Sequence, residues 1–205
     1  QIGVHAPGYK QGLKAALTAT HNLYLAHGKA IAAMRTNVPD GQLGITINPV
    51  QAEPASTSPE DLLAARRVDG GGTRWFLDPL FRGEYPADMV ELYGAEMPGI
   101  APNDMTTIAA PLDFLGVNYY FRQVVAYDPS NDNSFHIKTL HPDGEYTSMD
   151  WEVAPDAFYR LLTRIHRDYQ PKVMYITENG AAFVDQLDNG AVHDPHRTAY
   201  LQGYL

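Results

Sequence analysis

Short strand-like segments alternate with amphipathic helical segments along the chain, and this alternation is the feature that most restricts its fold. Apolar side chains recur at helical spacing over residues 13–34 and 155–169, and a third helical pattern starts at Pro195. Three short runs rich in apolar and β-branched residues are interspersed with these helices: residues 42–48, 113–120 and 172–177. The order predicts parallel β–α units, which either close into a barrel or form an open doubly wound sheet.

The segments between the expected strands carry turn and cap signals. Ser58-Pro59-Glu60-Asp61 predicts the start of a helix, because it combines a capping serine, a proline and first-turn acids. Gly70-Gly71-Gly72 is expected to end that helix, and a further helix is expected from Pro86 through Leu92. Residues 128–150 form a polar excursion in which residues 135–139 are a possible hairpin strand. An excursion of this length is large enough to wall a site.

Composition excludes several classes of function. The formal net charge of −9 and the lack of a Lys/Arg run give no electrostatic reason for binding nucleic acid. The chain has no cysteine, so disulfides and thiolate metal sites are excluded. No apolar run is long enough to span a bilayer, and no targeting signal is recognisable at the start, so a cytoplasmic location is expected.

Length also bears on the fold. The 205 residues fall short of the roughly 250 that a complete eight-fold barrel usually needs. The sequence begins without methionine, and its last residues, Tyr204 and Leu205, still follow the apolar pattern of a helix. We therefore expect the chain to be a fragment, with residues 1–205 forming part of a single domain.

Reactive side chains in parallel α/β folds collect where strands end, because there they point into a cleft held by a rigid sheet. The three expected strands end at Asn48, at Asn118-Tyr119-Tyr120 and at Thr177-Glu178-Asn179-Gly180. Glu178 stands out, because a carboxylate that follows five mostly apolar strand residues is poorly hydrated unless it is hydrogen-bonded or functional. It is therefore the first candidate for a catalytic group. The alternative is a structural glutamate, exposed at the strand end and paired with an arginine.

Ile176-Thr177-Glu178-Asn179-Gly180 resembles the nucleophile signature of glycoside hydrolase family 1, in which an aliphatic residue and Ser or Thr precede Glu-Asn-Gly. The match has no departure. Further segments similar to this family follow in the family's order: His5-Ala6-Pro7-Gly8, His21-Asn22-Leu23, Ala26-His27-Gly28, Arg74-Trp75-Phe76-Leu77-Asp78-Pro79-Leu80-Phe81 and Asp113-Phe114-Leu115-Gly116-Val117-Asn118-Tyr119-Tyr120. The resemblance thus covers nearly the whole chain.

The resemblance implies a (β/α)8 barrel of which this chain covers roughly the fifth to seventh strands and their flanking helices. It implies a retaining β-glycosidase of the β-glucosidase type, with Glu178 as the catalytic nucleophile and Tyr120 as a hydrogen-bond donor to it. Asn118 matches an asparagine that lines the cleft, and Trp151 matches a tryptophan that flanks the aglycone of a β-glucoside substrate. Tyr120 and Trp151 are alternatively a buried strand aromatic and a loop anchor. The family needs no cofactor or metal.

Histidine can bind metals or transfer protons, and three histidines of the chain are candidates for such roles. His193-x-x-His196 has a spacing that metal sites use, but a lone pair without a third ligand is more typical of a helix start. His21, on the first expected helix, is expected to be packed rather than catalytic. No metal site is predicted.

The second carboxylate of a retaining glycosidase is missing from the sequence. The resembled family carries its acid/base in an Asn-Glu-Pro segment, and no Asn-Glu-Pro occurs here. General acid catalysis is typically worth 10² to 10⁴-fold, so the chain alone is expected to be unstable or inactive. Missing barrel segments would be needed for a complete site. The alternatives are a non-catalytic sugar-binding α/β fragment and, without the resemblance, an open α/β domain with a structural Glu178.

Overall fold

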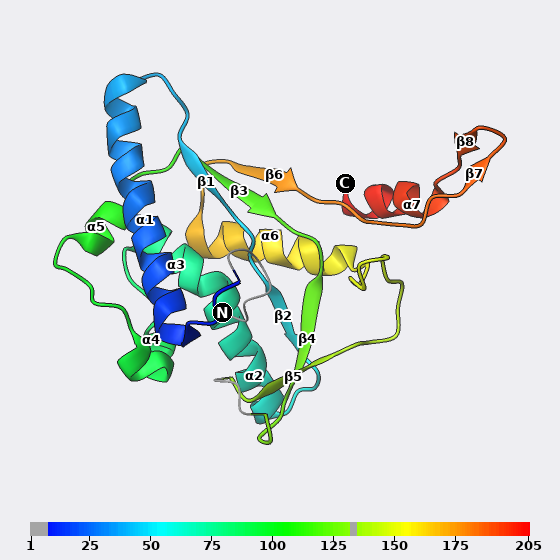
Figure 1. Cartoon of the computed structure of the whole chain (residues 1–205), viewed down its shortest axis with the longest axis horizontal. Helices are drawn as coiled ribbons and strands as arrows, with labels where there is room; N and C mark the ends of the chain where they lie inside the picture. The colour runs from blue at the N-terminus through cyan, green and yellow to red at the C-terminus, as the bar shows by residue number, and fades with distance from the viewer. Residues whose placement is uncertain (1–7, 132–134) are drawn as a thin grey trace.

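Three parallel strands form the sheet around which the chain is arranged (Figure 1). In the computed structural model, which describes residues 8–131 and 135–205, these strands are β1 (Gly44–Ile47), β3 (Phe114–Asn118) and β6 (Met174–Glu178). Their order is β1-β3-β6, and both neighbouring pairs are parallel. The predicted parallel β–α arrangement is confirmed, and the carboxyl ends of the three strands lie at one edge.

The three predicted helices are present as α1 (Gly12–Asn37), α6 (Pro155–Tyr169) and α7 (Pro195–Tyr204). The buried apolar face of α6 packs against the middle strand of the sheet, β3. Leu161 of α6 is fully buried in the same core cluster as Leu115 and Val117 of β3. Burial of each such side chain stabilises the fold by about 1.5–3 kcal/mol, which explains why α6 lies against β3.

Gly70-Gly71-Gly72 ends the α-helix as predicted, because α2 ends at Asp69 with Gly70 as its C-cap, but the chain does not leave the helical path there. The chain runs from α2 (Pro59–Asp69) through a π-helical turn, η1 (Gly70–Arg74), directly into α3 (Trp75–Arg82). Packing explains the difference, because a side chain at these glycines would meet neighbours. A Cβ at Gly70 would lie 2.2 Å from the sulfur of Met89, and one at Gly72 would lie 2.7 Å from Val50. Gly70 and Gly72 therefore let Met89 and Val50 approach the backbone closely, while the chain keeps helical dihedral angles.

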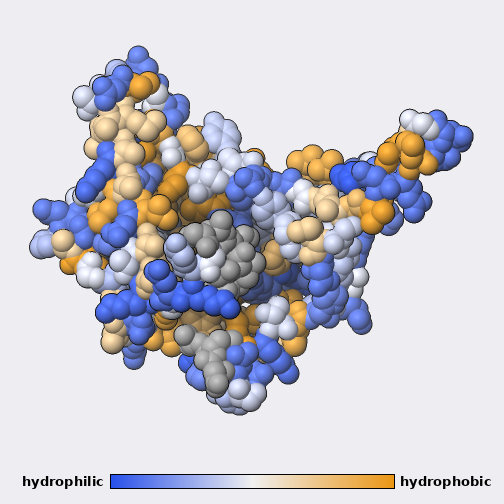
Figure 2. Space-filling view, in the orientation of Figure 1, coloured by the Kyte–Doolittle hydropathy of each residue, from blue (hydrophilic) through white to orange (hydrophobic). Residues whose placement is uncertain are grey.

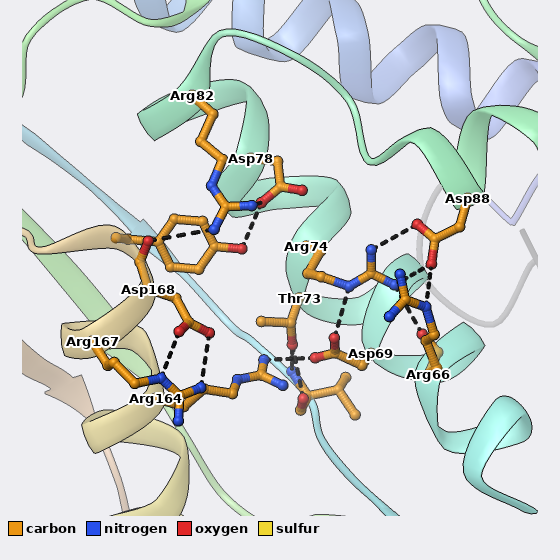
Figure 3. Close-up of polar contacts among 12 residues, drawn as sticks. Arg66, Asp69, Thr73, Arg74, Asp78, Arg82, Asp88, Arg164, Arg167 and Asp168 are labelled. Carbon is orange, nitrogen blue, oxygen red and sulfur yellow. Dashed lines mark hydrogen bonds and ion pairs between the residues drawn. The ribbon is translucent and has the colours of Figure 1, made fainter.

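A chain of ion pairs surrounds the π-helical turn (Figure 3). Arg74 contacts Asp69 at 2.9 Å through Nε and Asp88 at 2.7 Å through Nη1. Asp69 in turn lies 2.6 Å from Arg164 of α6. Alternating charges therefore tie the turn to α4 (Ala87–Tyr93) on one side and to α6 on the other.

A second sheet lies beyond the carboxyl ends of β1 and β3. It contains β2 (Gln51–Pro54), β4 (Arg122–Tyr127) and β5 (Ile137–Leu140), with β2 and β4 parallel and β4 and β5 antiparallel. β5 confirms the hairpin strand expected in the polar excursion. β2 lies in a stretch rich in Pro, Ser and Thr that carries no strand pattern, and its pairing with β4 supplies the stabilisation that its own sequence lacks.

The remaining elements are short: η2 (Gly94–Glu96), α5 (Asp104–Ile108), β7 (Leu187–Asp188) and β8 (Ala191–Val192). The helix expected from Pro86 through Leu92 is confirmed as α4. The predicted motif at His5-Ala6-Pro7 lies outside the described residues. Among the residues that are described, no helix is both long and apolar enough to cross a membrane.

β6 is exposed, although its sequence predicts a buried strand. Tyr175 and Ile176 are 55% and 44% exposed. β6 is the edge strand of its sheet, so it is paired on one side only. Figure 2 shows that apolar residues reach the surface in several places on this face, including the arm at the right where Figure 1 places β7, β8 and α7.

Candidate active site

Glu178 is the last residue of β6, and an irregularity in the ladder between β3 and β6 sets its direction. Val117 pairs with Ile176 but Asn118 pairs with Glu178, so Thr177 is an extra residue in β6. Such a bulge bends a strand and re-aims the side chains beside it. The Thr177 hydroxyl donates to Asn118 Oδ1 at 2.6 Å, which fixes the bulge to β3.

Tyr120 contacts Glu178 directly. Its hydroxyl donates a hydrogen bond to Glu178 Oε2. This hydrogen bond, assisted by partial burial and by the negative charge of Glu178, raises the pKa of Tyr120. Tyr120 therefore remains a neutral donor at physiological pH, as a residue that orients a carboxylate must.

The surroundings of Glu178 differ in one respect from those expected. The side chain is exposed rather than poorly hydrated, because β6 is an edge strand and nothing among the described residues covers it. The alternative of a structural glutamate paired with arginine finds no support in the described part of the chain, where Glu178 has no ion pair. Its side-chain partner is Tyr120.

Trp151 and Asn118 lie beside this pair. The indole of Trp151 is half-buried, with its ring centroid 5.0 Å from that of Tyr120 and 5.3 Å from that of Phe121. The structure thus brings Glu178, Tyr120 and Trp151 together in a row. Asn118 joins them through Thr177, and its carbonyl oxygen is occupied by the Thr177 hydroxyl.

Ion pairs that were not identified from the sequence support the row. Arg122 donates to both carboxylate oxygens of Glu152, at 2.8 Å from Nε and 2.6 Å from Nη2, and its Nη1 donates to Glu53 at 2.6 Å. Burial opposes ionisation of Glu53, but hydrogen bonds from Arg160 and Arg122 lower its pKa overall. Since Glu152 follows Trp151 and Arg122 lies two residues after Tyr120, this network connects the two aromatic residues. A charged residue one or two positions after each aromatic residue was the available signal.

His21 and His196 each contact other side chains. His21 is buried, with Nδ1 2.9 Å from the Tyr85 hydroxyl and Nε2 3.1 Å from Asp104. His196 lies in the first turn of α7, with Nδ1 3.1 Å from Glu145. Within residues 8–131 and 135–205, no group of three or more acidic or histidine side chains could hold a metal ion.

The chain is an α/β protein, because its parallel strands alternate with helices. Its acidic site lies at the carboxyl edge of the sheet, where β6 ends at Glu178 and the phenol of Tyr120 donates to that carboxylate. The model of glycosyl hydrolase family 1 matches residues 1–205. The chain belongs to glycosyl hydrolase family 1.

Similar proteins agree with this assignment. Beta-glucosidase A of Acetivibrio thermocellus is 38% identical over 100% of this chain and 46% of its own length. Beta-glucosidase A of Thermotoga maritima is 38% identical over 99% of this chain and 45% of its own length. The crystal structure of a beta-glucosidase from Exiguobacterium marinum matches with a TM-score of 0.93 and 39% identity, covering 100% of this chain and 47% of that one.

These comparisons confirm the predicted fold. The chain is part of a (β/α)8 barrel, and it spans about half the length of the relatives it matches. A solved structure of the family 1 glycoside hydrolase of Thermotoga maritima, complexed with a cyclophellitol analogue that mimics a transition state, covers 98% of this chain at a TM-score of 0.92.

Proposed function

We propose that this chain supplies the nucleophile half of the site of a retaining β-glucosidase, which acts once the rest of the barrel is present. The observation that carries the proposal is the hydrogen bond from Tyr120 to Glu178 at the carboxyl edge of β3 and β6. Family membership adds support, and the relatives named beta-glucosidases suggest β-glucosides as the substrate class.

In this mechanism, Glu178 attacks the anomeric carbon of the sugar. Its Oε contributes an electron pair to the new bond while the bond to the glycosidic oxygen breaks, and a second carboxylic acid, roughly 5–5.5 Å from the first, protonates that oxygen. The same group then removes a proton from water as the water oxygen bonds to the anomeric carbon, and the bond from that carbon to Glu178 breaks, which releases the sugar with retained configuration and restores the carboxylate. The second carboxylate must come from outside this chain, since its sequence has no Asn-Glu-Pro.

The other candidate residues have distinct tasks. Tyr120 fixes the rotation of the Glu178 carboxylate, so that the oxygen without the phenol faces the sugar. Trp151, packed beside Tyr120, offers a flat apolar surface for the leaving group. Asn118 Oδ1 accepts the hydrogen bond of the Thr177 hydroxyl, so the amide nitrogen of Asn118 is the part that can donate to a sugar hydroxyl.

Covalent trapping tests the nucleophile in a protein that carries this chain within the complete barrel. The probe is a 2-deoxy-2-fluoro-β-glucosyl fluoride, because fluoride leaves without protonation and the fluorine at C2 slows hydrolysis of the glycosyl-enzyme. Peptide mapping should find one fluorosugar on Glu178. Glu178→Gln should abolish labelling, whereas Glu145→Gln, which alters a carboxylate that contacts His196 instead, should leave it intact. Labelling at another residue would refute the assignment.

A further inference from the structure

Asn179 directly follows the candidate nucleophile, and its side chain takes the place of a backbone hydrogen bond. The backbone N–H of Tyr119 donates to the carbonyl of Glu178 at 2.9 Å. The carbonyl of Tyr119, at which a parallel ladder would next receive a backbone N–H of β6, accepts instead from Asn179 Nδ2 at 2.9 Å. The side-chain amide therefore completes the end of the ladder and lets the backbone leave the sheet immediately after Glu178.

The same amide reaches α7. Asn179 Nδ2 also donates to the Tyr200 hydroxyl at 2.9 Å. Tyr200 is only 2% exposed, and its ring stacks on that of Tyr204 with centroids 4.2 Å apart. Tyr200 and Tyr204 are four residues apart, so they lie on one face of α7. The hydroxyl groups of Tyr200 and Tyr204 therefore both point from α7 toward the rest of the protein.

The second hydroxyl, that of Tyr204, contacts the segment that follows Trp151. Tyr204 is 9% exposed, and its hydroxyl accepts from the backbone N–H of Ala154 at 2.8 Å. Ala154 precedes α6 and lies three residues after Trp151. Tyr204 also lies against Tyr119, with ring centroids 6.2 Å apart. One helix face thus contacts the segment that carries Glu178 and the segment that carries Trp151.

We propose that Asn179, Tyr200 and Tyr204 are positioning residues, through which α7 fixes Glu178 relative to Tyr120 and Trp151. Tyr200 holds the Asn179 amide, which fixes the backbone at Glu178. Tyr204 holds the segment between Trp151 and α6. Their importance for hydrolysis rests on the proposed function, but the contacts themselves can be tested without substrate.

A purely structural role would give a different result from a positioning role. If Tyr200 and Tyr204 only pack α7 onto the core, their rings suffice, and loss of a hydroxyl would leave Glu178 in place. Tyr→Phe variants keep the ring, so they separate the two roles. Tyr120 reports the position of Glu178, because its pKa is raised by the hydrogen bond between them.

The experiment titrates Tyr120 by NMR in the 205-residue chain, with tyrosines labelled by ¹³C at Cζ. Tyr200→Phe and Asn179→Ala should lower the pKa of Tyr120 toward the value found in Glu178→Gln, which defines complete loss of the contact. Tyr204→Phe should shift the fluorescence of Trp151. Tyr159→Phe, which removes a hydroxyl from a side chain that is 69% exposed on α6, is the matched control and should change neither signal.

An unchanged Tyr120 titration in a folded Tyr200→Phe variant would overturn the proposal. Should that variant fail to fold, Asn179→Asp replaces it, since aspartate keeps the shape of the side chain but cannot donate to the Tyr119 carbonyl. A folded Asn179→Asp chain in which Tyr120 titrates as in the unmodified chain would likewise refute the role. Because no substrate is involved, failure here is distinct from failure of the trapping experiment.

Discussion

At the residue scale, Arg74 shows how a partly buried charge is made tolerable. Its side chain is 18% exposed, and its guanidinium contacts Asp69, Asp88 and the carbonyl of Arg66. Burial opposes the charge, but the hydrogen bonds with Asp88 and Asp69 raise the pKa of Arg74. In return, hydrogen bonding to Arg74 is the main cause that lowers the pKa of Asp88 to about 2.

Stability should therefore depend on the charge of Asp88 in acid. Its pKa in the folded chain lies below the ordinary value of about 3.9, so its contribution is present above pH ~4 and is lost as the pH falls toward 2. Asp88→Asn should lower the free energy of unfolding at pH 7 by about 1 kcal/mol, a figure reduced for partial exposure. Urea unfolding at pH 7, 4 and 2 measures the difference.

The control is Asp40→Asn, because Asp40 is exposed and forms no ion pair with any described residue. It should change the free energy of unfolding little at any pH. If Asp88→Asn lowered stability equally at pH 7 and pH 2, the effect would come from altered shape rather than from the lost charge.

The candidate site was predicted at this scale only in part. Glu178 and Tyr120 were predicted together, and the structure joins them by a hydrogen bond. The contacts of the residues that directly follow Trp151 and Glu178 were not predicted: Glu152 pairs with Arg122, thirty positions away, and Asn179 donates to Tyr200 on α7. A local pattern reports which face of an element is apolar, whereas contacts between distant polar residues depend on the tertiary arrangement.

At the element scale, helix glycines separate into those that are needed for packing and those that are not. Gly28, in the middle of α1, lies against α5, and a Cβ there would be 1.9 Å from the carbonyl oxygen of Thr107. Gly203, on α7, has ordinary contact distances of 3.5 Å and more to Pro155. The π-helical continuation at Gly70-Gly71-Gly72 was not predicted for the same reason, because helix propensity carries no information on how closely a neighbouring side chain approaches.

Alanine should therefore have opposite effects at these two glycines. Gly28→Ala should destabilise the chain by about 1–3 kcal/mol, since the helices must separate to admit the methyl group. Gly203→Ala should stabilise it by up to about 1 kcal/mol, because alanine has the higher helix propensity. Thermal unfolding of both variants beside the unmodified chain tests the pair. Stabilisation by both substitutions would contradict the close contact between α1 and α5.

At the scale of the whole molecule, the barrel segment has open strand edges. The outer edges of β1 and β6 are unpaired among the described residues. Successive strand residues point to opposite faces, so the exposure of Tyr175 and Ile176 means that both faces of β6 are accessible. A closed barrel pairs every strand edge, whereas this chain spans about half the length of the barrels it matches.

The isolated chain should therefore associate with itself through β6. Sedimentation velocity over a range of concentrations should show dimers or larger species, and Ile176→Lys should shift the distribution toward monomer, because a charge on an exposed edge opposes strand pairing. Val184→Lys is the matched control, since Val184 is 80% exposed but lies outside every strand. If Val184→Lys restored the monomer and Ile176→Lys did not, the segment between β6 and α7 would be the associating surface, and the prediction for β6 would be wrong.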